Sequence, residues 1–504
     1  MTIQERLRGL APEALKGIRR GIEKESLRVR PDGSLSTAPH PQALGSALTH
    51  PHITTDFSES QLELITGVHE RVDACLEELA EIHKVVFRAI GDEVLWCASM
   101  PCNLPADDAI PIGRYGASNV GRAKAVYRTG LSYRYGRRMQ AISGIHYNLS
   151  MPGVTSEQYF ALIRNFRRRS WLLLYLFGAS PAVCSSFVAG RSHELTELAP
   201  GTLYAPHGTS LRMGRLGYQS DAQASLAVSY NSLKSYTASL YDALIKPYPP
   251  YEKIGIQVDG EYRQLNTTLL QIENEFYGTI RPKRRIRRGE RPLHALRERG
   301  VEYVEVRLMD LDPFVGVGIG AGTMRFLDVF LLHCLLDASP DDTPAEIGEI
   351  KRNQQKVALR GREPGLLLEK NRENVGFAEW GMQVLAECEP IAAALDRAHG
   401  GGSTFRDVLL AAGVVVRNPH AAPSARVLDA MARDHRNIYV RFVLAESLRH
   451  AGSLRGLPLG AGAKARFAHL AGESLEEQRR IEAGDKVDFE TFRKQYLSPD
   501  LLIV

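Results

Sequence analysis

The sequence predicts an α+β fold built on a mainly antiparallel sheet, and three observations lead to this prediction. In the first two thirds of the 504-residue chain, short segments of alternating apolar and polar residues are bounded by turn signals. Long segments with apolar residues at helical spacing lie between them, without the regular strand–helix alternation of a parallel sheet. From about residue 340 onwards, helical segments follow one another, separated by glycine-rich turns.

The predicted elements follow the chain in order. Residues 18–29 form a strand that ends at a Pro-Asp-Gly turn, and residues 70–90 form a helix with one apolar face. Further strands are expected over 144–150, 269–277 and 301–308, and a hairpin over 254–264 around its Asp-Gly pair. Further helices are expected over 156–177, 222–245, 323–337, 343–359, 377–398, 424–449 and 464–483. We therefore expect one core unit over residues 1–340 and a helical region over residues 341–504 packed onto the same unit.

The composition excludes several classes of protein. The hydrophobic fraction of 44% and the charged fraction of 24% are those of a globular protein rather than a disordered chain. The longest strongly apolar run, residues 171–177, is far shorter than the ~20 residues that span a bilayer. The charged N-terminus does not resemble a signal peptide. A net charge of +5 is nearly balanced for this length, which argues against nucleic acid as the main partner.

The six cysteines show no spacing typical of a zinc or redox motif. They are also too sparse for a disulfide framework in a chain of this length. We therefore expect free thiols and a cytoplasmic location.

Carboxylates on strand faces are the strongest chemical signal. Glu23 and Glu25 are two residues apart, so on a strand they share one face, roughly 7 Å apart. Asp56 and Glu63 lie beside apolar residues, and His146 shares a strand face with Asn148 and Ser150. On the later strands Glu305 shares a face with Arg307, and Glu273 shares one with Glu275. Carboxylates in apolar strands are costly to bury unless they are paired or bind cations, so the joint pattern predicts a site for hard divalent cations.

A basic run begins at Arg281, Lys283 and Arg284 and continues to residue 291. A solvated loop, a phosphate-contacting segment and a nucleic-acid surface are the three interpretations of this run, and the near-neutral total charge disfavours the last. The chain carries neither a GxxxxGK[ST] loop nor HExxH nor GxSxG. From the residues alone, the clustered acids and histidine also suit a metal-dependent phosphohydrolase.

Seven segments, taken together, resemble the proteobacterial type of glutamate–cysteine ligase. They are GIEKESLRV (21–29), ALGSALTHPHITTDFSESQLELIT (43–66), YGASNVGRAKAVYRTGL (115–131), MQAISGIHYNLSMP (139–152), TSLRMGRLGY (209–218), QIENEFYGTIRPKR (271–284) and GVEYVEVRLMDLDPF (300–314). The resemblance implies a glutamine-synthetase-like catalytic core over 1–340, in which a curved antiparallel sheet surrounded by helices forms an active-site funnel. It also implies ATP-dependent ligation of the L-glutamate γ-carboxylate to the L-cysteine amine through a γ-glutamyl phosphate, the first step of glutathione synthesis.

The resemblance assigns roles to individual residues. The metal ligands would be Glu23, Glu25, Asp56, Glu63, His146 and Glu305, holding two or three Mg²⁺ ions for which Mn²⁺ substitutes. Arg307 would contact the transferring phosphoryl group, and Arg281, Lys283 and Arg284 would lie near ATP. The amino-acid pocket would consist of Phe57, Tyr127, Leu131, Gln140, Arg212, Tyr218 and Tyr277. A related ligase that joins glutamate to another amine remains an alternative. We further expect inhibition by glutathione and a monomeric enzyme, with neither nucleic acid nor membrane as a partner.

Overall fold

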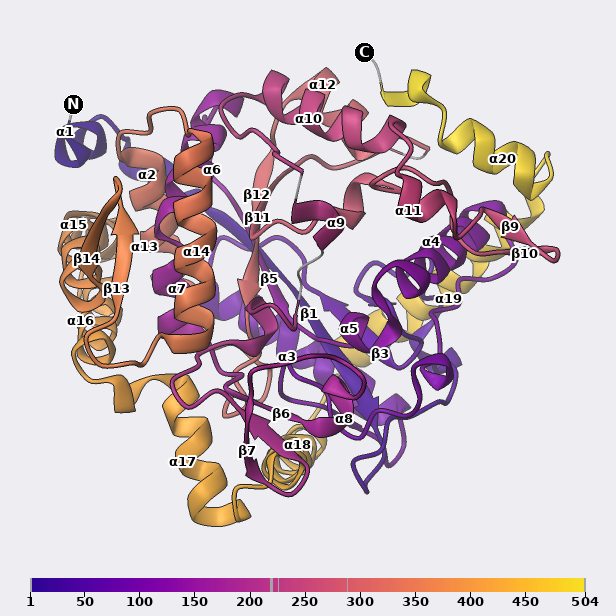
Figure 1. The fold of residues 1–504 in the computed structure, drawn as a ribbon, viewed down its shortest axis with the longest axis horizontal. Helices are drawn as coiled ribbons and strands as arrows, with labels where there is room; N and C mark the ends of the chain where they lie inside the picture. Colours follow the sequence, from indigo (N-terminus) through magenta and orange to yellow (C-terminus); the bar gives the residue numbers. More distant parts are fainter. Residues whose placement is uncertain (1, 218–220, 225, 288, 503–504) are drawn as a thin grey trace.

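A seven-stranded sheet occupies the centre of the molecule (Figure 1), in a computed structural model that describes residues 2–502 except 218–220, 225 and 288. The strand order is β11 (Ile280–Lys283), β12 (Tyr303–Met309), β5 (Ile145–Ser150), β1 (Arg19–Val29), β3 (Gln61–Ile65) and β2 (Ile53–Thr55), and β4 (Val94–Leu95) pairs with β1. Every pairing in this sheet is antiparallel. The predicted α+β class with a mainly antiparallel sheet is therefore confirmed.

Helices α3 (Val72–Ala89) and α13 (Ala321–Leu336) cover one face of this sheet. Lys24 of β1 reaches His83 of α3, with 3.1 Å between Nζ and Nε2. The Tyr147 hydroxyl of β5 donates to Oδ1 of Asp328 in α13 at 2.6 Å. Because side chains alternate along a strand, the residues that precede Lys24 and Tyr147 point to the opposite face. Contacts on the covered face thus hold β1 and β5 against the two helices, and Glu23 and His146 point from the opposite face.

The other long helices surround the sheet (Figure 1). They are α4 (Asn119–Tyr135), α6 (Ser156–Arg169), α7 (Trp171–Phe177), α10 (Leu233–Ile245), α12 (Pro292–Arg299), α14 (Pro344–Arg360), α15 (Phe377–Ala398), α16 (Thr404–Arg417), α17 (Pro423–His435), α18 (Tyr439–Gly456), α19 (Ala461–Ala483) and α20 (Phe489–Tyr496). In the described residues no helix is long and apolar enough to cross a membrane.

Short elements complete the chain. The short helices are α1 (Ile3–Arg8), α2 (Pro12–Lys16), α5 (Arg137–Gln140), α8 (Ser185–Val188), α9 (Asp221–Ala224) and α11 (Pro249–Glu252). Three small antiparallel sheets are formed by β6 (Ala182–Cys184), β8 (Thr202–Tyr204) and β7 (Thr196–Ala199), by β9 (Gln257–Val258) and β10 (Glu261–Tyr262), and by β13 (Leu367–Lys370) and β14 (Glu373–Gly376). The hairpin β9–β10 turns at Asp259 and Gly260, both with positive φ, as the Asp-Gly pair predicts.

The last third of the chain packs closely against the rest. One continuous hydrophobic cluster includes buried residues from Leu15 to Leu502. Helix α20, yellow in Figure 1, lies beside α4, and α19 packs against α3. Glu482 and Asp485 accept the backbone N–H groups of Ala117 and Asn119 at 2.9 Å and 2.6 Å, close to the start of α4. The C-terminal helices therefore hold the N-terminal end of α4 in place.

The predicted strand over 269–277 is wrong. The segment contains the 3₁₀ turn η4 (Glu273–Glu275) and joins no sheet. The two glutamates form ion pairs with arginines elsewhere in the chain: Glu273 pairs with Arg291 at 2.6 Å, and Glu275 pairs with Arg134 at 2.8 Å. Neither acid joins the proposed cation site, and side-chain hydrogen bonds replace a strand ladder here.

Three predicted helices are shorter or divided. The helix over 156–177 is divided at Ser170, where α6 ends and α7 begins. Within the predicted helix 222–245, only α9 and α10 are helical among the described residues. The helix over 424–449 is interrupted between α17 and α18, because Arg436 and Asn437 adopt φ values of 53° and 60°.

The prediction that all cysteines are free thiols is wrong for one pair. Cys102 and Cys184, 82 residues apart in the sequence, form a disulfide with 5.2 Å between their Cα atoms. The other four, Cys75, Cys97, Cys334 and Cys388, are buried free thiols. The spacing of cysteines in the sequence cannot identify this pair, because Cys102, in the loop after β4, comes next to Cys184 of β6 only in the folded chain.

Candidate active site

The strand register places the predicted acids on one face of the sheet. Glu25 of β1 lies opposite Glu63 of β3, and Glu23 of β1 lies opposite His146 of β5. On the next strand along, Glu305 of β12 lies opposite Asn148 of β5. Since all these positions share one face, four neighbouring strands contribute to a single cluster.

Short distances join four of the predicted residues. His146 Nδ1 lies 3.0 Å from Oε2 of Glu23 and 3.6 Å from Oε1 of Glu305, and its Nε2 lies 3.6 Å from Oε1 of Glu25. Glu23, His146 and Glu305 each offer one ligand atom within 4.8 Å of the others. The imidazole of β5 thus stands between three carboxylates, two from β1 and one from β12.

The electrostatics of the cluster favour a bound cation. Burial and the charge of Asp56 raise the pKa of Glu25 to about 8. Burial and the charges of Glu23, Asp56 and Glu25 raise the pKa of Glu63 well above its usual range. Burial also lowers the pKa of His146, which leaves a ring nitrogen able to bind a metal. These carboxylates repel one another, and a divalent cation removes that repulsion.

The donor set fits magnesium or manganese. It consists of carboxylate oxygens and one imidazole, without a thiolate, which suits hard cations rather than structural zinc. Two buried oxygens, Oδ1 of Asn148 and Oε2 of Glu305, accept no hydrogen bond from any described residue, and the Lys283 ammonium, the cation paired with the latter, lies 3.5 Å away. Unsatisfied buried oxygens beside an acidic cluster are what a cation or its bound water would satisfy.

Basic side chains line the β11–β12 side of the cluster. Arg307 Nη1 lies 2.9 Å from Oε1 of Glu305, and Lys283 Nζ lies 3.5 Å from Oε2 of the same carboxylate. Although burial opposes ionisation, Lys283 and Arg307 hold the pKa of Glu305 well below its usual range. Arg281 is buried and donates to the Asn274 carbonyl at 3.0 Å, whereas Arg284 donates to the Arg299 carbonyl at 2.8 Å. The run therefore begins as a sheet strand rather than a solvated loop.

Among the described residues predicted for the amino-acid pocket, Tyr127 and Leu131 lie on α4, Gln140 on α5 and Arg212 in the 3₁₀ turn η3 (Leu211–Met213), while Phe57 and Tyr277 lie in loops. Gln140 donates to the Tyr277 hydroxyl at 2.8 Å. Arg212 is buried and donates to the Arg307 carbonyl at 2.8 Å, which links this group to the strand of Glu305. Phe57 and Leu131 are buried, and Tyr127 is half-buried. Tyr218 lies outside the described residues.

Sequence reasoning assigned no role to three residues that shape the site. Asn148 donates to Oε1 of Glu23 at 3.0 Å. The Tyr115 hydroxyl and the Arg128 guanidinium both donate to the backbone carbonyl of Asp56, the former at 3.0 Å, and so fix the turn after β2. Asn148 could have been found from its shared strand face with His146, but the partners of Asp56 depend on the placement of α4.

The chain resembles known proteins over most of its length. The family model described as glutamate–cysteine ligase matches residues 7–357. The chain is similar to the glutamate–cysteine ligase of Alcanivorax borkumensis, 46% identical over 96% of this chain and 97% of that protein. It is also similar to that of Pseudomonas entomophila, 48% identical over 99% and 97%.

Two solved structures resemble the fold. A crystal structure of glutamate–cysteine ligase from Francisella tularensis in complex with AMP superimposes with a TM-score of 0.91, at 37% identity, covering 95% of this chain and 97% of that one. A bifunctional glutathione synthetase from Pasteurella multocida superimposes with a TM-score of 0.69 at 24% identity, covering 97% of this chain and 60% of that one. The second likeness is one of fold alone.

Proposed function

The chain belongs to the glutamate–cysteine ligase family, and we propose from this premise how its acidic strand face takes part in the reaction. It catalyses the ATP-dependent formation of γ-glutamylcysteine from L-glutamate and L-cysteine, the first step of glutathione synthesis. The crystal structure of the Francisella relative contains AMP, which fits ATP as the nucleotide substrate. Membership of this family favours a ligase over the phosphohydrolase that the clustered acids and histidine also suit.

We propose that Glu23, Glu25, Asp56, Glu63, His146 and Glu305 hold Mg²⁺, in two or three ions, with Mn²⁺ as a substitute. The observation that carries this proposal is the central position of His146 between Glu23, Glu25 and Glu305. Bound Mg²⁺ supplies positive charge that reduces the repulsion between the glutamate γ-carboxylate and the triphosphate.

The residues themselves supply the remaining functions. Arg307, whose side chain is 23% exposed, reaches from Glu305 into the site, and we propose that its guanidinium binds oxygens of the transferring phosphoryl group. Lys283, 30% exposed, pairs with the same Glu305 carboxylate, and we propose that its ammonium would contact the polyphosphate of ATP. Arg281 and Arg284 are bound to backbone carbonyls and stabilise the strand that carries Lys283. The γ-carboxylate then attacks the γ-phosphorus, ADP leaves, and a γ-glutamyl phosphate results.

The amino-acid pocket completes the proposal. Phe57, Tyr127, Leu131 and Tyr277 provide the aromatic and apolar surface that suits a small thiol side chain, joined by Tyr218 outside the described residues. Arg212 binds the L-cysteine carboxylate, and Gln140 orients the Tyr277 hydroxyl. The cysteine amine attacks the acyl phosphate carbon and displaces phosphate. Glutathione contains the γ-glutamylcysteine unit, so we expect it to compete for this pocket.

We further propose that the sheet is the curved, glutamine-synthetase-like funnel. The contrast between its faces supports this proposal, because one face is covered by α3 and α13 whereas Glu23 and Arg307 keep 18% and 23% exposure on the other. We also propose residues 1–340 as the catalytic core. Residues 341–504 would then form a helical region of the same structural unit. We also propose that the whole chain acts as a monomer.

The acyl phosphate is tested with L-glutamate labelled with ¹⁸O in its γ-carboxylate. If the carboxylate attacks ATP, one labelled oxygen appears in the inorganic phosphate released, because the C–O bond breaks when the amine displaces phosphate. Inorganic phosphate free of label would contradict the intermediate. Omission of L-cysteine, or its replacement by other amines, in an ADP-release assay identifies the second substrate.

A further inference from the structure

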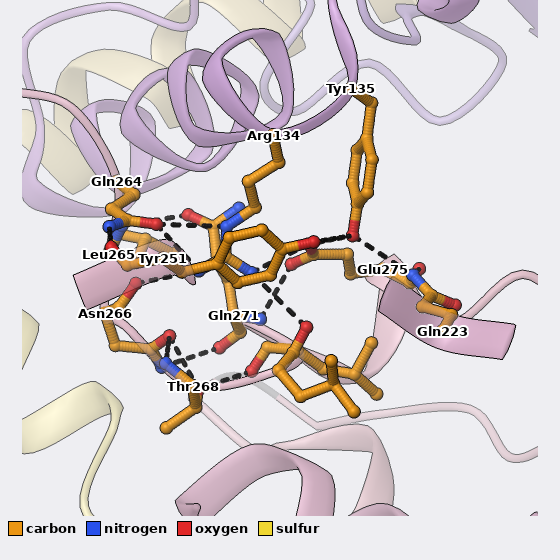
Figure 2. A network of polar contacts seen from close by, with 12 residues as sticks. Arg134, Tyr135, Gln223, Tyr251, Gln264, Leu265, Asn266, Thr268, Gln271 and Glu275 are labelled. Atoms are coloured by element: carbon orange, nitrogen blue, oxygen red, sulfur yellow. Dashed lines mark hydrogen bonds and ion pairs between the residues drawn. The ribbon is translucent and has the colours of Figure 1, made fainter. Parts of the chain in front are cut away.

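A buried ion pair, drawn in Figure 2, stands apart from the acidic cluster and lies next to the segment that carries Tyr277. Arg134, near the end of α4, pairs with Glu275 at 2.8 Å, and both side chains are fully buried. Arg134 also donates to Oε1 of Gln264 at 3.0 Å and 2.8 Å and to the Asn266 carbonyl at 2.8 Å. A buried pair overcomes its desolvation penalty only when such additional hydrogen bonds are made.

Glu275 connects this pair to Tyr127. Its Oε1 also accepts the Tyr135 hydroxyl at 2.7 Å, and its Oε2 accepts the backbone N–H of Gln271 at 2.7 Å. The Gln271 side chain in turn donates to the backbone carbonyl of Tyr127 at 3.2 Å. The carboxylate thus fixes a residue that holds one tyrosine of the pocket.

The same group of residues holds Tyr277. Gln223 donates to the Glu275 carbonyl at 2.8 Å and accepts the backbone N–H of Tyr277 at 3.0 Å. Gln223 also donates to the Tyr135 hydroxyl at 3.2 Å, and the Tyr135 and Tyr277 rings meet edge to face at 5.7 Å. Residues 263–279 contribute no strand to any sheet, so these side-chain contacts replace a strand ladder in positioning Tyr277.

We propose that Tyr135 and Gln223, anchored by the Arg134–Glu275 pair, are positioning residues that set the Tyr127–Tyr277 wall of the L-cysteine pocket. The inference rests on the proposed function, because that function places these two tyrosines beside L-cysteine. The Tyr135 hydroxyl links the ion pair to Gln223, because it donates to Glu275 and accepts from Gln223. Its loss loosens the Tyr277 wall without removing a group from substrate or from the acidic cluster.

The test variant is Tyr135→Phe in the full-length enzyme, which removes one hydroxyl and leaves the ion pair in place. We expect KM for L-cysteine to rise about five- to tenfold, the worth of one or two hydrogen bonds, while KM for ATP and kcat stay within about twofold. The matched control is Tyr175→Phe, whose buried hydroxyl donates to the Val415 carbonyl at 2.9 Å on another side of the molecule. We expect this control to have the parental KM values.

Gln223→Met provides a second variant of similar shape that lacks both hydrogen bonds to the Tyr277 segment. We expect a similar rise in KM for L-cysteine, and a Tyr135→Phe/Gln223→Met double variant no worse than about the larger single effect, because the two act through one network. A parental KM for L-cysteine in Tyr135→Phe overturns the inference, as does an equal rise in KM for ATP. Absence of ligase activity in the parent enzyme would instead refute the proposed function.

Discussion

Gly144 makes room for Arg212, and adding one methyl group there tests the role proposed for that arginine. Gly144 immediately precedes β5 and is not among the glycines with positive φ, so alanine strains no backbone angle. A Cβ atom at this position would lie 2.0 Å from Nη2 and 2.5 Å from Cζ of Arg212. The substitution Gly144→Ala therefore acts on the guanidinium first.

The size of the effect follows from these distances. An ordinary carbon–nitrogen contact needs about 3.4 Å, so the guanidinium must move by roughly 1.4 Å. That displacement breaks the 2.8 Å hydrogen bond from Arg212 to the Arg307 carbonyl. A misplacement of about 1 Å in a group that orients a substrate reduces the rate by up to ~10²-fold. We expect kcat/KM for L-cysteine to fall by about that factor while KM for ATP changes less than about threefold.

Steady-state ADP release at varied L-cysteine, L-glutamate and ATP measures the effect, with the melting temperature recorded in parallel. The matched control is Gly452→Ala in α18, where an added methyl group meets no atom within 4 Å. We expect this control to keep parental kinetics. Parental kcat/KM for L-cysteine in Gly144→Ala would refute the reasoning, because Arg212 would then not depend on its present position.

Three further predictions concern the charges of the site. Arg307→Lys keeps the charge but loses the planar fork, so kcat should fall by about 10²-fold in the ADP-release assay, whereas a fall of less than about threefold would remove Arg307 from phosphoryl binding. EDTA should abolish activity and excess Mg²⁺ or Mn²⁺ restore it; full activity in metal-free buffer would contradict the metal assignment. The pKa of Glu25, raised to about 8, means that folding favours its protonated form, so the metal-free protein loses stability as pH rises from about 4.5 to 8. Calorimetry should therefore show a larger Mg²⁺-induced rise in melting temperature at pH 8 than at pH 6, and an equal rise would contradict this linkage.

The acidic face could be predicted from sequence because its information is local. Alternation along a strand places Glu23 with Glu25, and Glu305 with Arg307, whatever the rest of the fold does. The register that puts His146 opposite Glu23 depends instead on how two strands far apart in the sequence, β1 and β5, pair. The resemblance to the ligase family supplied that step.

Features that depend on distant partners could not be predicted. Glu273 and Glu275 have the spacing of a strand face, yet Arg291 and Arg134 bind them away from the site. Cys102 and Cys184 are 82 residues apart, so only the fold brings them close enough to form their disulfide. The sequence also does not reveal why position 144 needs glycine. Arg212, which occupies the space next to Gly144, is 68 residues away, and nothing near Gly144 in the sequence indicates the contact.

The most direct test of the account is to count the divalent ions that the acidic face holds. Mn²⁺ binding to the full-length enzyme is titrated by electron paramagnetic resonance of the free ion, in parallel for the parent and for Glu23→Gln, which keeps the shape of the side chain but removes its charge. The account predicts two or three tightly bound ions in the parent, and at least one lost or weakened by about tenfold or more in a variant that still folds. Equal stoichiometry and affinity in the two proteins would contradict the assignment of this strand face as the metal site.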